Sequence, residues 1–430
     1  MSLLYNFVLL VSAAFLLPYY LLRGLRHGKS RRGIRERLGY YDPDVLAALQ
    51  AQPFVWIHAV SVGETRAALP LIKRLKKDYP DYRILLTNVT ETGRAIAADN
   101  SNIDYCLFFP FDFSWAVRRV LTQLRPALIL LVETEIWPNF TRQAETLGIP
   151  LMLVNGRLSD RSYPRYRRLR LLLKPLLQGF TAFCMQSQQD ADRIMSLGGD
   201  AARVENTGNL KFDYEHRVVD DQRLQLLRNR YGLCAENTVL VAGSTHDGEE
   251  KILLDSYRQI TPRIKKQPVL VLIPRHPERR REVEATLKKS HIDYRLRSQM
   301  AAGDDCLRPG QVLLVDTLGE VMDLYALADL VFVGGSLVPV GGHNLLEAAL
   351  LAKPVLFGPH VHNFKSISTK LMRAGAGVKV QNQQELEQQT VLLLNDSARA
   401  RAMGEAGQAL IVENAGATER TMRHIRKVLG

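Results

Sequence analysis

The sequence is poor in cysteine and lacks the spacings that cysteines adopt in disulfide-rich or zinc-binding proteins. Its four cysteines, at positions 106, 184, 234 and 306, lie far apart and form neither a CxxC pair nor a Cys/His pattern. This distribution argues against a disulfide framework and against a structural zinc site. It favours a reducing compartment for the main part of the chain.

The sequence also lacks a short-period repeat, a low-complexity tract and a convincing cluster of metal ligands. The acidic pair Asp304-Asp305 does not follow a strand, as the carboxylates of a metal-binding DxD motif do. We therefore expect no metal and no cofactor. The length of 430 residues favours two sizeable domains over one.

Positive charge is concentrated in two short segments. The net charge is +13, and Arg23–Arg37 and Arg161–Lys174 each contribute +6. The rest of the chain is nearly balanced, and it has no aromatic residues interleaved with basic ones, so we expect no nucleic-acid partner. Two local basic patches instead indicate an anionic surface or ligand.

Two segments suggest contact with a membrane. Residues 3–22 carry no charge, are long enough to span hydrocarbon as a helix, and precede the basic segment Arg23–Arg37. We predict an uncleaved anchor over residues 1–22, with the following chain in the cytoplasm; the alternative is a buried apolar helix. Residues 163–177 predict a basic amphipathic helix, kinked or ended by Pro175, that lies on lipid or packs on the core.

Strands and helices alternate along both halves of the remaining chain, which predicts an α/β fold with doubly wound parallel sheets. Apolar runs place strands at 54–59, 83–87, 128–132 and 151–154, and again at 239–242, 269–273, 312–315, 330–333 and 354–357. Two Rossmann-like domains facing one cleft make the GT-B architecture. We predict domains at 23–210 and 211–430, and the last helix could pack back on the first domain.

A glycine-rich segment after the strand at 330–333 carries the clearest functional pattern. The paired Gly341 and Gly342 would let backbone N–H groups approach a phosphate, and a helix is expected to open near His343. Asn344 follows, and Glu347, one turn inside that helix, could accept two ribose hydroxyls. The alternative is a glycine-rich turn whose Glu complements the helix dipole.

Other polar residues follow strands of both halves, where open α/β sheets bind their ligands. In the second half these residues are Ser244, Thr245, Pro274, Arg275, His276, Gly319 and Glu320, each of which could instead cap a helix. In the first half, Glu64 either completes a capping box with Ser61 or deprotonates an acceptor hydroxyl. Glu133 and Glu135 end the strand at 128–132, and Lys211 lies in the linker, within reach of the same site.

Seven stretches of the chain together resemble the Kdo transferases, which add 3-deoxy-D-manno-oct-2-ulosonic acid to lipid A precursors. They occur in the order of that family and are SVGET (61–65), ETEIWPN (133–139), NGRLSDRS (155–162), GNLKFD (208–213), AGSTHDGEE (242–250), PRHPER (274–279) and GGHNLLEAA (341–349). The N-terminal anchor is also similar to that of the family.

The resemblance implies a GT-B enzyme without an essential metal, which moves Kdo from CMP-Kdo to lipid IVA with inversion. It implies a catalytic part on the cytoplasmic side of the inner membrane, in contact with its lipids. On this reading Glu64 is the general base. Ser244, Arg275, Gly341, Gly342, Asn344 and Glu347 would hold CMP.

Two other interpretations remain open. The chain could be another GT-B enzyme that uses a UDP-sugar, such as a UDP-GlcNAc 2-epimerase, although an epimerase needs no membrane anchor. It could also be a membrane-anchored protein that binds lipid without catalysis. No local pattern indicates how many Kdo residues would be added.

Overall fold

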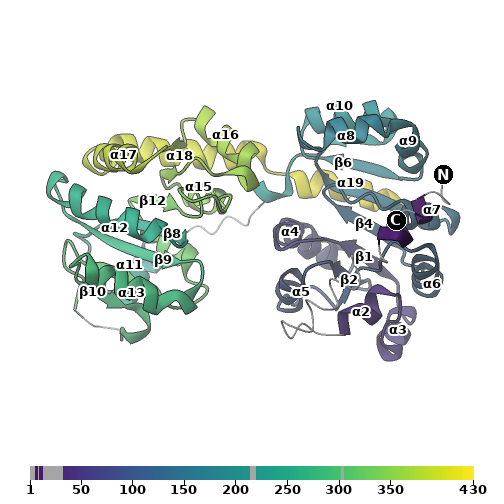
Figure 1. The fold of residues 1–430 in the computed structure, drawn as a ribbon, viewed down its shortest axis with the longest axis horizontal. Coiled ribbons are helices and arrows are strands. Elements are labelled where there is room, and N and C mark those ends of the chain that lie inside the picture. The colour runs from purple at the N-terminus through teal and green to yellow at the C-terminus, as the bar shows by residue number, and fades with distance from the viewer. Residues whose placement is uncertain (1–4, 8, 13–31, 214–218, 302–304) are drawn as a thin grey trace. The chain divides into compact units, whose positions relative to one another are not determined.

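The computed structural model describes residues 5–7, 9–12, 32–213, 219–301 and 305–430. The chain forms two compact units, one of residues 1–213 with 414–430 and the other of residues 214–413 (Figure 1). Each unit contains a seven-stranded sheet in which all paired strands are parallel, so the predicted pair of parallel α/β domains is confirmed. The first unit extends to Asp213, and residues 414–430 return to it.

The sheet of the first unit has the order β3-β2-β1-β4-β5-β6-β7. Its strands are β1 (Phe54–His58), β2 (Arg83–Asn88), β3 (Tyr105–Phe108), β4 (Leu128–Val132), β5 (Leu151–Gly156), β6 (Ala182–Met185) and β7 (Val204–Asn206). Successive residues of β1 enter two separate apolar clusters, Trp56 on one face and Ile57 on the other. Both faces are therefore covered by helices, which explains the continuous apolar runs in the central strands.

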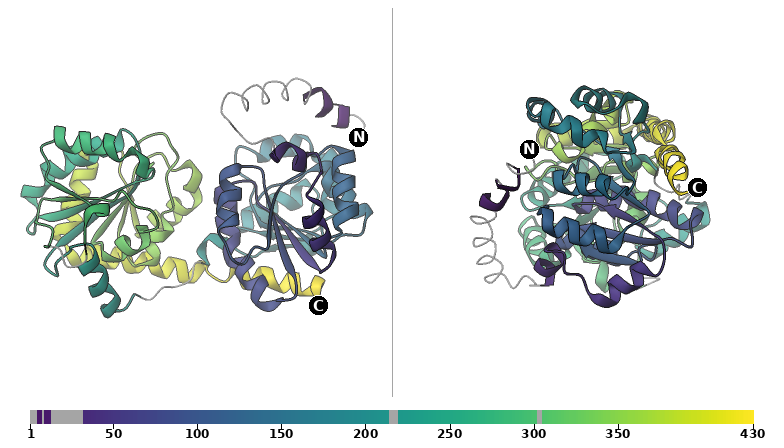
Figure 2. Two further views of the ribbon diagram at one scale, coloured as in Figure 1. Left: turned by 90° about the horizontal axis from the view of Figure 1, so that it is seen from below. Right: turned by 90° about the vertical axis from the view of Figure 1, so that its right-hand side faces the viewer.

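Most helices of the first unit follow its strands in sequence, but the last one comes from the end of the chain. They are α2 (Arg32–Arg37), α3 (Pro43–Gln50), α4 (Val62–Asp78), α5 (Glu91–Ala98), α6 (Ser114–Leu124), α7 (Pro138–Thr146), α8 (Tyr163–Arg168), α9 (Arg170–Gln178), α10 (Gln188–Leu197) and α19 (Ala417–Leu429). Met422 and Ile425 of α19 are fully buried in the cluster that contains Ile57. Figure 2 shows this helix, in yellow beside the C label, running along the first unit. Asp213 caps α19 by accepting from the backbone N–H groups of Gly416, at 2.7 Å, and of two following residues.

The sheet of the second unit has the order β10-β11-β9-β8-β12-β13-β14. Its strands are β8 (Thr238–Thr245), β9 (Pro268–Pro274), β10 (Tyr294–Leu296), β11 (Val312–Leu314), β12 (Leu330–Val333), β13 (Val355–Phe357) and β14 (Gly377–Lys379). Its helices are α11 (Asp221–Arg230), α12 (Glu249–Ile260), α13 (Arg280–Lys289), α14 (Val321–Leu327), α15 (Leu346–Leu350), α16 (Lys365–Arg373), α17 (Gln383–Asn395) and α18 (Ser397–Asn414). The register between β8 and β9 shifts at Gly243–Thr245, where Ser244 has a φ of 57°.

The two segments predicted to contact a membrane differ in how much of each the structure describes. Most of the anchor at residues 1–22 lies outside the described residues, and no helix within the described part is long and apolar enough to cross a membrane. Residues 163–177 form two helices that meet at Leu169 rather than one. Pro175 does not end the helix, because it lies inside α9, which continues to Gln178, and a kink at Pro175 stays a prediction.

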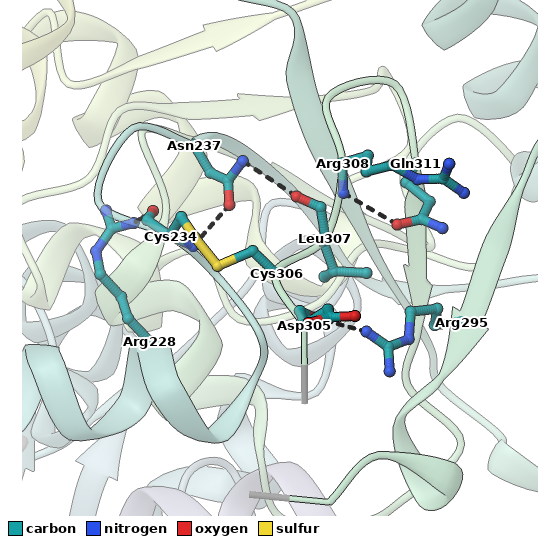
Figure 3. Close-up of a disulfide and its surroundings, with 9 residues drawn as sticks. All are labelled: Arg228, Cys234, Asn237, Arg295, Asp305, Cys306, Leu307, Arg308 and Gln311. Carbon is teal, nitrogen blue, oxygen red and sulfur yellow. Dashed lines mark hydrogen bonds between the residues drawn. A yellow bond between two sulfur atoms is a disulfide. The ribbon is translucent and has the colours of Figure 1, made fainter. Parts of the chain in front are cut away.

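The cysteines of the second unit differ from the expectation. Cys234 and Cys306 form a disulfide, with their Cα atoms 5.7 Å apart (Figure 3). Asn237 joins the same two loops by accepting from Cys234 N at 2.7 Å and donating to Leu307 O at 3.3 Å. The sequence spacing of 72 residues gave no indication of this pairing, because contact depends on how β8 to β11 bring the two loops together.

Candidate functional site

The first group of predicted residues lies at the carboxyl end of the sheet in the first unit. Ser61 caps α4, and the Glu64 carboxylate accepts from Val60 N at 2.6 Å and from Ser61 Oγ at 3.1 Å. The predicted Ser61 cap is therefore formed, although the Glu64 carboxylate accepts from Val60 N, one residue before the cap, rather than from Ser61 N as in a standard capping box. It also fixes the carboxylate at the strand edge, so the structural and catalytic interpretations of Glu64 are compatible.

Glu64 has an unusually basic carboxylate. Burial is the main cause, with contributions from the charges of Glu133 and Glu135, and together they raise its pKa to about 7. Burial and the charge of Glu133 also raise the pKa of Glu135 to about 7. A carboxyl group with a pKa near neutrality can both accept and release a proton under physiological conditions, as a general base must.

Glu133 and Lys211 connect this edge to the end of the first unit. Lys211 Nζ lies 3.3 Å from Glu133 Oε1, and both side chains are mostly buried. Glu133 has a φ of 63°, a left-handed conformation that is rare for residues other than glycine and common where function requires a particular geometry. The structure thus brings together the four residues that the sequence assigned to acceptor binding and catalysis, namely Glu64, Glu133, Glu135 and Lys211.

The second group lies at the carboxyl ends of β8, β9 and β12 in the second unit. Gly243 on β8 is paired with Val333 on β12 and with Ile273 on β9, so the loops that follow these strands share one edge of the sheet. Arg275 N donates to Thr245 O at 2.9 Å, which joins two of these loops. Thr245 itself is fully buried, and its hydroxyl donates to Glu250.

The glycine-rich segment is held by a carboxylate within the protein. Glu249, which is fully buried, accepts from the backbone N–H groups of Gly335, Ser336 and Leu337 at 2.6 to 2.9 Å. Gly341 N and Gly342 N both donate to Gly335 O. The expectation that these paired glycines offer N–H groups to a phosphate is therefore not met in this structure, since a buried carboxylate and a carbonyl already use the donors of the loop.

The helix after this segment begins later than the sequence suggested. We expected it near His343, but α15 starts at Leu346 and has five residues. Gly341 and Gly342 have φ values of 113° and 77°, which a helix cannot contain. Asn344 accepts from Leu346 N, and its amide donates to Glu347 Oε1 at 3.2 Å, so the Glu347 carboxylate is oriented by a neighbouring predicted residue.

The remaining predicted residues fall into two sets. His276 lies beside the loop after β8, with its ring centre 5.8 Å from that of His246. Gly319 and Glu320 precede α14 as expected, but the Glu320 carboxylate contacts Arg230 and Arg297 at 3.0 and 3.2 Å. These ion pairs give Glu320 a structural role, and its predicted contact with a nucleotide stays a prediction.

Sequence reasoning missed His246 and Glu249. His246 Nε2 lies 2.8 Å from Nε2 of the predicted His343, although 97 residues separate them. The sequence signal for His246 was its position directly after the predicted site residues Ser244 and Thr245. Glu249 gave no signal beyond its place in the AGSTHDGEE stretch. Within the described ranges, no group of three His, Cys, Asp or Glu side chains is arranged to hold a metal ion.

Comparison with known proteins identifies the family. The model for the family described as 3-Deoxy-D-manno-octulosonic-acid transferase (kdotransferase) matches residues 32–214. A 3-deoxy-D-manno-octulosonic acid transferase of Haemophilus influenzae is 32% identical over 429 residues, covering 99% of this chain and 98% of that protein. The chain belongs to the Kdo transferase family. It is therefore a glycosyltransferase.

Two further matches concern length and fold. A bifunctional glycosyltransferase/methyltransferase of Fusobacterium nucleatum is 35% identical over 85% of this Kdo transferase chain, which spans 56% of that protein's length. The UDP-GlcNAc 2-epimerase of Neisseria meningitidis, solved with UDP-GlcNAc, is 13% identical with a TM-score of 0.58, over 87% of this chain and 99% of that one. This second likeness concerns the fold alone, an architecture of two parallel-sheet domains that GT-B enzymes share.

Proposed function

We propose that this Kdo transferase moves Kdo from CMP-Kdo to lipid IVA with inversion at the anomeric carbon. Glu64 carries the proposal, because its raised pKa and its place at the edge of the first sheet suit a base for an acceptor hydroxyl. The acceptor oxygen attacks the anomeric carbon from the side opposite the phosphate and gives its proton to Glu64. The bond between the anomeric carbon and the phosphate oxygen breaks, and its electron pair leaves with CMP.

The residues around Glu64 maintain its reactivity. The negative charge of Glu133 raises the pKa of Glu64, and Lys211 limits that effect by pairing with Glu133. On the donor side, Arg275 suits a phosphate, since its guanidinium offers several donors. Glu347, oriented by Asn344, suits the ribose hydroxyls of the nucleotide.

The direct test is the mass of the product made from purified chain, CMP-Kdo and lipid IVA. We expect a mass increase equal to one or more Kdo residues, and the size of the increase gives the number transferred. UDP-GlcNAc in place of CMP-Kdo is the matched control. Transfer from the UDP-sugar alone would overturn the proposed donor, and no transfer from either would overturn the proposed reaction.

We also propose that the first unit lies on the cytoplasmic face of the inner membrane. On α9, Leu171 is 87% exposed and Leu172 is 45% exposed, while Leu173, Leu176 and Leu177 face the core. Exposed arginines and a lysine surround these leucines, a combination that suits an anionic lipid surface better than water.

The described part of the N-terminal segment supports attachment along the surface. The Tyr5 hydroxyl donates to Asp112 at 2.9 Å, and Asn139 Nδ2 donates to Asn6 at 2.7 Å. These polar pairs hold residues 5 and 6 against the start of α7, which favours a monotopic anchor over one that spans the bilayer.

Vesicle binding tests this membrane surface. In a chain lacking residues 1–22, replacing Arg167, Arg170 and Lys174 with Gln should weaken binding to anionic vesicles, because each cation near the surface contributes roughly 1 kcal/mol. Use of lipid IVA should fall in parallel, while CMP affinity stays unchanged. Parental vesicle binding by the triple variant would show that α9 is an ordinary surface helix.

A further inference from the structure

Two histidines from different loops meet at the edge of the second sheet. His246 follows β8 and His343 precedes α15, and β8 and β12 are neighbours in the sheet. Their Nε2 atoms are 2.8 Å apart, the ring planes differ by 6° and the ring centres are 5.0 Å apart, so the rings meet edge to edge. This geometry is that of a hydrogen bond between two imidazoles.

The loops around the pair are built to keep it in place. His246 N donates to the buried Glu249 carboxylate at 3.0 Å, and the same carboxylate binds the loop at Gly335. A Cβ atom at Gly335 would lie 3.0 to 3.1 Å from the His343 ring, and Gly335 has a φ of 64°. A side chain at position 335 would therefore be strained and would press on His343.

An Nε2–Nε2 contact at this distance can contain only one hydrogen. A neutral imidazole has one N–H donor and one acceptor nitrogen, whereas an imidazolium has two donors. The pair can therefore consist of two neutral rings, or of one neutral ring and one protonated ring. Protonation of both rings would place two N–H groups against each other and break the contact.

The surroundings of His246 favour its neutral form. Burial is the main cause that lowers the pKa of His246, followed by the nearby His276. Arg279 lies 2.9 Å from Glu250, and Glu249 already accepts four N–H donors, so both carboxylates are engaged. The titratable and charged groups near His246 include Glu249, Glu250, Asp247, Arg275, Arg279 and His276, with Glu278 beside His276.

We propose that His246 and His343 form a binding site for the donor phosphate that takes up a proton when the phosphate binds. A phosphate oxygen placed beside the pair adds a negative charge that is not already paired with donors or cations, as those of Glu249 and Glu250 are. It therefore stabilises a protonated ring that donates to the phosphate. This inference rests on the proposed function, in which CMP-Kdo is the donor, and it adds His246 to the residues that contact it.

Calorimetry of CMP binding to the full chain tests the proposal. Titrations at one pH near 7, in buffers with different ionisation enthalpies, give the number of protons taken up on binding. CMP itself titrates near pH 6, so the informative quantity is the difference between parent and variant. We expect His246→Gln to reduce the number of protons taken up on CMP binding by up to one. The CMP affinity of the parent should fall more steeply with rising pH than that of the variant, by up to about an additional tenfold per pH unit.

Three controls make the outcome decisive. Cytidine, which lacks the phosphate, should bind parent and variant equally and without proton uptake, which also shows that the variant site is folded. His343→Gln should match His246→Gln, and the double variant should add little to either. His424→Gln, which removes a histidine bonded to Glu205 in the first unit, should keep parental uptake.

Equal proton uptake by parent and His246→Gln would overturn this inference and leave the donor assignment intact. If the parent chain bound neither CMP nor cytidine, the proposed function itself would fail.

Discussion

Replacing Glu64 with Gln should abolish transfer and at the same time stabilise the protein above neutral pH. An amide keeps the size of the carboxyl group and can still accept from Val60 N, but it cannot take the proton of an acceptor hydroxyl. Loss of a general base typically lowers kcat by about 10² to 10⁴-fold. The parent enzyme should gain activity as pH rises through about 7, where Glu64 loses its proton.

The effect on stability follows from the raised pKa of Glu64. A folded-state pKa of about 7, above the ordinary value of 4.5, means that the folded protein favours the protonated carboxyl. The free energy of unfolding therefore falls as pH rises from about 4.5 through about 7. Above pH 7 this decrease in stability is complete. A difference of about 2.5 pKa units corresponds to roughly 3 kcal/mol. Glu64→Gln avoids this loss because Gln stays neutral.

Denaturant unfolding and steady-state kinetics, each followed from about pH 5 to 9, would measure both effects. The variant should be more stable than the parent at pH 8, by an amount that shrinks toward pH 5. Glu135→Gln is the matched control, since the pKa of Glu135 is also about 7. It should gain stability similarly and keep a rise of activity with pH, moved to lower pH because the charge of Glu135 contributes to the raised pKa of Glu64. Near-normal turnover by a folded Glu64→Gln variant would reduce Glu64 to a capping residue, and equal stability at pH 8 would refute the raised pKa.

Three further outcomes are expected. Glu347→Ala and Arg275→Ala should each weaken CMP binding by roughly 1.5–3 kcal/mol, because each removes a charged hydrogen-bonding group; unchanged affinity by calorimetry in both would show that the nucleotide site is misplaced. Treatment with EDTA should leave transfer largely intact, because cationic side chains can stabilise the leaving phosphate; loss restored by Mg²⁺ would contradict this. Reducing the Cys234–Cys306 disulfide should lower the unfolding free energy of the second unit by up to about 4 kcal/mol, the value expected for a bridge that closes a loop of 72 residues. An unchanged denaturation midpoint in dithiothreitol would show that the bridge does not contribute to stability.

The central strands could be predicted because their environment leaves a simple signal. Strands such as β4 and β12 are buried on both faces and read as continuous apolar runs. The strands that were missed are β3, β6, β7, β10 and β14, and all of them except β6 are partly exposed. They lack the continuous apolar run that marks β11 and β13, which are equally short but buried. Four of them, β3, β7, β10 and β14, are the outermost strands of their sheets.

The strand-end residues could also be predicted, but the contacts among them could not. Lys211 reaches Glu133 from 78 residues away, and His343 meets His246 from 97 residues away. The buried Glu249 carboxylate binds the loop that begins 86 residues later, at Gly335. The backbone N–H groups of this glycine-rich loop, expected to bind a phosphate, therefore bind a carboxylate of the protein itself. Such pairings depend on which strands become neighbours, and the local sequence does not contain that information.

The return of α19 to the first unit has a consequence for the order in which the protein is made. The core around Ile57 includes Met422 and Ile425, and the cap from Asp213 to Gly416 joins residues 203 positions apart. A ribosome therefore completes every residue of the second unit before it releases the last helix of the first. The unit that begins first is finished last, and until then its nascent sheet exposes the apolar surface that α19 will cover.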